Sequence, residues 1–146
     1  MRTAIREISG AKDLFDEGEG FFRVVESSHR KPAIFTPEIV HNLLCMAIEK
    51  YAMSILLSMG ALPDNHTFSD LVEALKPQIP VSPGIEEALL ALDQEADLCS
   101  LELRQPSLPT PDRMEFLKGI GRRFKEAARE AVLEGNTFTL QLESIE

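Results

Sequence analysis

The three histidines, His29, His41 and His66, are the residues best suited to acid–base or metal chemistry in this chain, because imidazole titrates near neutral pH and binds metals. His41 is followed at helical spacing by Cys45 and Glu49, a row that places three metal-binding groups on one helix face. No second cluster supplies further ligands, so we predict no metal site. His29 lies in a charged turn and is expected to be solvated, whereas His66 is expected to cap a short helix or pack under its loop.

Serine and glycine patterns indicate no further chemistry. The sequence has neither a G-x-S-x-G turn nor a phosphate-cradling loop, so we predict no catalytic residue and no cofactor. Gly119 and Gly121 lack the preceding strand of a nucleotide-binding fingerprint. We interpret them as a site of close helix packing, which could meet small residues on one face of another helix at Ala47, Ser54 and Ser58.

The charge distribution is more informative. With 15 Lys and Arg against 24 Asp and Glu, the net charge is −9, which argues against general nucleic-acid binding. Acidic residues such as Asp93 and Asp97 are interpreted as a solvated face. Basic residues gather in one C-terminal segment: Arg113, Lys118, Arg122, Arg123, Lys125 and Arg129. They either pair with Glu115, Glu126 and Glu130 on the same helix or form a positive stripe that attracts phosphate or an acidic partner.

Hydrophobic periodicity predicts the elements that must position these groups. The pattern indicates helices over about 3–27, 37–59, 68–76, 83–101 and 111–134. Thr36, Ser82 and Thr110 each precede a proline suited to the first helical position, and Gly60 suits a helix end. The helix over 37–59 is apolar nearly all round in its second half and should be central. We predict an all-α fold, an up-and-down bundle of four long helices plus a short one.

Two regions depart from regular periodicity. Gly18 and Gly20 weaken the first helix, which is expected to bend or break there. Residues 1–135 are assigned to a single bundle, and 136–146 to a C-terminal tail whose alternating pattern is typical of a strand. The tail could pair with its twin in a dimer, lie on the bundle or be disordered, and we favour packing on the bundle.

Compartment signals are consistent with a cytoplasmic protein. The N-terminal segment is charged and lacks the apolar core of a signal peptide. The longest apolar segment, 39–59, is interrupted by polar residues, so no membrane association is expected. Cys45 and Cys99 show no CxxC spacing, and we expect buried thiols in a reducing compartment.

Part of the sequence resembles the HEPN superfamily. The resemblance rests on the segment 47–57, which includes Ala47, Glu49 and Lys50, followed by Gly60, Pro63 and His66. Leu103-Arg104 before a proline-rich stretch is similar to the exit from the third helix of the family. The resemblance covers about residues 5–134 and is specific only from the second helix to the loop after it.

The resemblance implies a bundle that dimerises, and for some members partnership with a small nucleotidyltransferase or binding of a nucleotide. RNase members use an R-x4-6-H motif near the start of the last helix, but no histidine follows His66 in this sequence. Arg23 and His29 match that spacing at the end of the first helix, which is the wrong place. The positions that match the family pattern, Glu49, Lys50, His66 and Arg104, could line a polar site between the second and fourth helices or be structural.

We therefore hypothesise a non-catalytic, homodimeric binding or regulatory module that partners a nucleotidyltransferase or binds a nucleotide. A second hypothesis is a degenerate RNase toxin that acts through Arg23 and His29. In a third, the basic last helix docks an acidic partner through Arg122 and Arg123, with a nucleotidyltransferase as one example.

Overall fold

Five α-helices make up most of the described chain, in agreement with the predicted all-α fold. The computed structural model describes the backbone of residues 2–101 and 109–135, and the side chains of 10–94 and 109–135. The helices are α1 (Arg2–Ser27), α2 (Pro37–Ser58), α3 (Phe68–Leu75), α4 (Pro83–Leu101) and α5 (Pro111–Arg129). A 3-10 turn, η1 (Ser28–Arg30), follows α1, and a π-helical turn, η2 (Glu130–Glu134), extends α5. The predicted tail strand lies outside the described residues.

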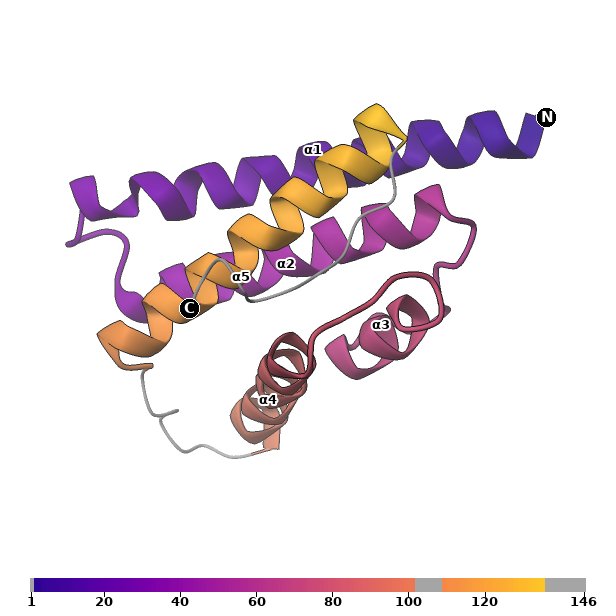
Figure 1. Ribbon diagram of the computed structural model, residues 1–146. Helices are drawn as coiled ribbons and strands as arrows, with labels where there is room; N and C mark the ends of the chain where they lie inside the picture. Colours follow the sequence, from indigo (N-terminus) through magenta and orange to yellow (C-terminus); the bar gives the residue numbers. More distant parts are fainter. Residues whose placement is uncertain (1, 102–108, 136–146) are drawn as a thin grey trace.

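The three long helices α1, α2 and α5 pack together (Figure 1). α1 and α2 run antiparallel, and α5 lies over both of them. α3 and α4 pair with each other beside α2, and α4 is seen almost end-on where α1 and α2 run across the view. The structure thus refines the predicted up-and-down course, because α4 crosses the direction of the long helices.

The ends of α2 follow the predicted signals. Thr36 precedes the helix in an extended conformation, and its side-chain oxygen accepts a hydrogen bond from the Ile39 N–H at 3.4 Å. At the other end Gly60 has a φ of 68°, which favours glycine. The Gly60 N–H donates to the Leu57 carbonyl at 3.0 Å and the Ala61 N–H to the Leu56 carbonyl at 2.8 Å. This is the Schellman arrangement, which satisfies carbonyls that a helix end leaves without partners.

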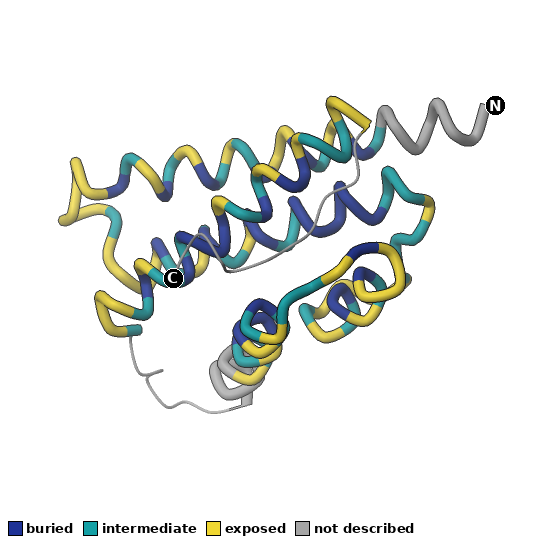
Figure 2. The backbone as a smooth tube through the Cα atoms, viewed as in Figure 1, coloured by how far each residue is buried: buried dark blue, intermediate teal, exposed yellow. Residues whose placement is uncertain are grey.

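α2 is the central helix, as its composition predicts. Its residues from Tyr51 to Leu56 are all buried, six consecutive positions that cover every side of the helix. By length and composition α2 also qualifies as a membrane span, but more than half of its most apolar window is buried inside the bundle. The core helix of a soluble protein has the same length and composition. Figure 2 shows the buried residues of α2 continuing onto the facing sides of its neighbours.

Two glycines set how closely the long helices approach. A Cβ added at Gly18 would lie 2.9 Å from ring carbons of Tyr51 and 3.4 Å from the carbonyl oxygen of Ala47. The lack of a side chain at Gly18 thus lets α2 pack closely against α1. A bend or break was expected here, but α1 runs unbroken from Arg2 to Ser27. At Gly121 an added Cβ would lie 2.7 Å from Phe22 and 3.0 Å from Leu44. α5 thus packs closely as predicted, but against these large side chains of α1 and α2.

Helices α3, α4 and α5 also begin where the sequence indicates. The Arg113 N–H donates to the Thr110 side chain at 3.1 Å, and the Ile85 N–H donates to Ser82 at 3.4 Å. α3 begins after Thr67, whose side chain accepts from the Asp70 N–H at 3.1 Å. His66 is exposed, so the predicted capping role belongs to its neighbour Thr67.

Candidate binding site

An open cleft of about 280 Å³ lies between α1 and α5. It is lined by Phe22 and Glu26 from α1 and by Arg122, Lys125, Glu126 and Arg129 from α5. Residues three, four and seven apart share one side of a helix, which explains why these four α5 positions face the same cleft. Three cations and two carboxylates thus share one surface of an otherwise acidic chain.

The floor of the cleft is apolar. Phe22 is only 1% exposed, and Gly121 lets the α5 backbone approach its ring. The Lys125 ammonium lies 5.8 Å from the centre of that ring, within the range of a cation–π contact. The packing of α1 on α5 therefore fixes the base of the cleft, and the charged side chains stand along its rim.

Lys125 links the two helices by charge. Its ammonium lies 3.8 Å from carboxylate oxygens of both Glu19 and Glu26 on α1. Glu19 also accepts a hydrogen bond from the buried Tyr51 hydroxyl at 2.9 Å. Burial raises the pKa of Tyr51 well above its usual value, and the hydrogen bond to Glu19 raises it further. These interactions join α1, α2 and α5 and leave Lys125 engaged with the protein itself.

Arg122 and Arg129 differ from the other cations around the cleft. Both are exposed, and neither forms an ion pair with a described residue. By contrast, Lys118 pairs with Glu115 at 3.4 Å and Arg123 with Glu126 at 3.7 Å on the same helix. Pairing within the helix is thus observed for part of the basic segment. The guanidinium groups of Arg122 and Arg129 can instead donate hydrogen bonds to a partner.

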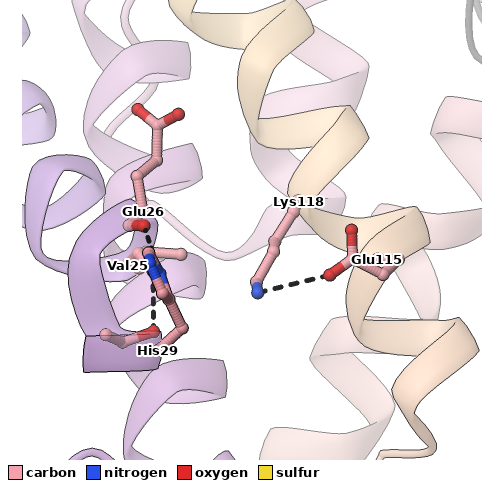
Figure 3. A network of polar contacts seen from close by, with 6 residues as sticks. Val25, Glu26, His29, Glu115 and Lys118 are labelled. Atoms are coloured by element: carbon pink, nitrogen blue, oxygen red, sulfur yellow. Dashed lines mark hydrogen bonds and ion pairs between the residues drawn. The ribbon is translucent and has the colours of Figure 1, made fainter. Parts of the chain in front are cut away.

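The end of α1 has a structural arrangement of its own. The Ser28 hydroxyl donates to the Val25 carbonyl at 2.7 Å, and Nδ1 of His29 lies 3.2 Å from the Glu26 carbonyl oxygen. Figure 3 shows His29 folded back onto the last turn of α1, with Lys118 and Glu115 across from it on α5. His29 therefore contacts one carbonyl at the end of α1, and no described hydrogen bond or ion pair joins it to Arg23.

The residues chosen from the family pattern are not brought together by any described contact. The Lys50 ammonium lies 3.4 Å from a carboxylate oxygen of Glu17 on α1. Glu49 is half-buried on α2, and His66 is exposed in the loop before α3. Arg104 lies outside the described residues. The polar site expected between the second and fourth helices thus stays a prediction, and the structure assigns Lys50 a contact with α1.

Asp93 corrects one sequence interpretation. It was assigned to a solvated face, but its two carboxylate oxygens accept hydrogen bonds from the Phe68 N–H at 2.8 Å and the Ser69 N–H at 2.6 Å. These are N–H groups at the start of α3, which need acceptors from outside the helix. Asp93 therefore clamps α4 to α3. No helix-periodicity signal could have revealed this contact, because it joins residues 25 positions apart.

Sequence reasoning also missed the α1 side of the cleft. The signal was present as Glu19 and Glu26, which lie seven residues apart on one face of α1 and are opposite in charge to Lys125. Among the described residues there is no group of three His, Cys, Asp or Glu that could hold a metal ion. No protein-family model, curated protein or solved structure matched this chain.

Proposed function

We propose that this protein is a non-catalytic binding module whose cleft between α1 and α5 holds an anionic group of its partner. The observation that carries the proposal is that Arg122 and Arg129 line the cleft without an ion pair among the described residues. The six lining side chains include no histidine, cysteine or serine, and the two carboxylates, Glu26 and Glu126, lie beside the cations Lys125 and Arg123. The arrangement suits binding better than catalysis.

The energetics favour a ligand that contacts both arginines. Lys125 already lies beside the carboxylates of Glu19 and Glu26, whereas Arg122 and Arg129, on the same side of α5, have no anionic partner among the described residues. An exposed ion pair contributes only about 0.2–1 kcal/mol, so a single carboxylate would bind weakly. A partner must therefore supply two or more anionic groups, and its binding should weaken with added salt.

The cleft favours carboxylates of a protein surface over nucleotide phosphates. Glu26 and Glu126 lie among the cations, and they would repel a compact, multiply charged phosphate group. An open surface that alternates in charge suits electrostatic complementarity between proteins. The HEPN resemblance supplies a candidate partner, a nucleotidyltransferase, and a candidate assembly, the homodimer. A bound nucleotide is the rival source of the anion.

The test is a titration followed by the backbone amide signals of the protein in NMR at low salt. The probes are poly-L-glutamate, ATP and inorganic phosphate, each added to the wild type and to the Arg122→Gln/Arg129→Gln variant. Arg30→Gln/Lys31→Gln is the matched control, because it removes the same charge from exposed positions after α1.

We expect poly-L-glutamate to shift the amides around residues 122 and 129 in the wild type and the control, but not in the cleft variant. Stronger shifts with ATP or phosphate at the same amides would identify a phosphate ligand. If no probe shifts these amides, or if the cleft variant responds like the wild type, the proposal is wrong.

A further inference from the structure

Building on the proposed function, we infer that the partner segment is an acidic helix that lies along α5 and presents two carboxylates two turns apart. The surface that it would contact is the row Arg122, Glu126 and Arg129. Its charges alternate positive, negative and positive along one side of the helix. A complementary segment must therefore place its anionic groups at the two ends of this row.

The spacing of the arginines selects the form of the segment. Arg122 and Arg129 are seven residues apart on an α-helix, which places their Cα atoms about 10.5 Å apart along one face. A partner helix with carboxylates seven residues apart has the same separation. On a strand, residues that share a face are about 6.7 or 13 Å apart, so neither spacing matches. The phosphates of one nucleotide are directly linked and cannot span the row as well.

The middle of the row restricts the partner further. Glu126 is 60% exposed, and its carboxylate lies 3.7 Å from the Arg123 guanidinium. Glu126 thus keeps a negative charge in the middle of the row, so the facing position of the partner is neutral or basic. An acidic residue there would meet a carboxylate at close range and oppose binding. The expected pattern is an acidic residue at each end and none between them on the contacting face.

An apolar contact extends the row at one end. Leu133 lies four residues beyond Arg129 in η2, and half of its surface is exposed. It lies about one turn further along the same side. A partner helix that continues past its second carboxylate would place an apolar residue on Leu133. Burial of these two apolar side chains would strengthen binding through the hydrophobic effect, which salt does not screen.

The test uses alanine-rich helical peptides of equal length and equal charge. One carries two glutamates seven residues apart and a leucine four residues beyond them, and the matched peptide carries the glutamates five residues apart, on different faces. Affinities are measured by NMR titration at low salt, with the wild type, Arg129→Gln and Leu133→Ser.

We expect the first peptide to bind about two- to fivefold more tightly, the effect of one exposed ion pair. Arg129→Gln should abolish this difference, and Leu133→Ser should weaken binding at low and high salt alike. Equal affinity of the two peptides would overturn the helix geometry but leave the proposed function standing if poly-L-glutamate still shifts the cleft amides. If poly-L-glutamate and both peptides fail to bind, the proposed function fails as well.

Discussion

The junction of α3 with α4 and the cleft between α1 and α5 both place charge where two helices meet, but the charge serves different ends. At the junction both oxygens of Asp93 accept N–H donors of α3, at 2.8 and 2.6 Å. At the cleft Arg122 and Arg129 have no such partner among the described residues. The charge of Asp93 is used within the fold, whereas we propose that the two unpaired arginines of the cleft bind a partner.

The floor of the cleft should be the most sensitive to change. In Gly121→Val, the new side chain would overlap the Phe22 ring, because the Cβ alone would lie 2.7 Å from it. We expect a loss of about 3 kcal/mol in the free energy of unfolding, the upper range for overpacking a core. Urea unfolding measures it, with Gly20→Ala as the control, since an added Cβ there meets nothing within 4 Å. Equal stability of the two variants would show that this helix contact is not close.

The clamp between α3 and α4 should give the next largest effect. In Asp93→Ala, two N–H groups at the start of α3 lose a charged acceptor. We expect the free energy of unfolding to fall by about 2 kcal/mol. Glu87→Ala removes the same charge from an exposed position on α4 and should change stability by less than about 0.5 kcal/mol. If Asp93→Ala behaves like Glu87→Ala, the hydrogen bonds at the junction do not stabilise the fold.

Tyr51 tests the polar contact beneath the cleft. Tyr51→Phe removes the hydrogen bond to Glu19, and we expect a loss of about 1 kcal/mol at neutral pH.

The pH dependence follows from the raised pKa of Tyr51, which burial causes first and Glu19 second. The unfolded chain releases the phenol proton near pH 10, before the folded protein does. Ionisation of Tyr51 therefore leaves the free energy of unfolding unchanged below about pH 10. Above pH 10 it lowers the free energy of unfolding by up to about 1.4 kcal/mol per pH unit. Urea unfolding of both proteins between pH 8 and 11 should show the stability of the wild type falling toward that of Tyr51→Phe. If the difference in the free energy of unfolding between the two proteins stays constant with pH, the pKa of Tyr51 is not raised in the folded protein.

Local signals predicted the elements, and contacts between distant residues had to come from the structure. Thr36, Thr110 and Gly60 mark helix ends through bonds to their own neighbours, so the sequence contains all the information needed. Periodicity placed the cations of α5 on shared faces but could not say which helix lies opposite. The partners of Lys125 and Asp93 are on other helices, and no spacing rule within one helix reveals them.

The measurement that tests the central contrast most directly is urea unfolding of the Arg122→Gln/Arg129→Gln variant at low salt. If these arginines bind a partner and do not stabilise the fold, replacing both leaves the free energy of unfolding within about 0.5 kcal/mol of the wild type. A loss of more than about 1 kcal/mol would mean that the fold itself depends on them. In that case the α1–α5 cleft would be structural, like the α3–α4 junction, and the contrast between the two regions would be wrong.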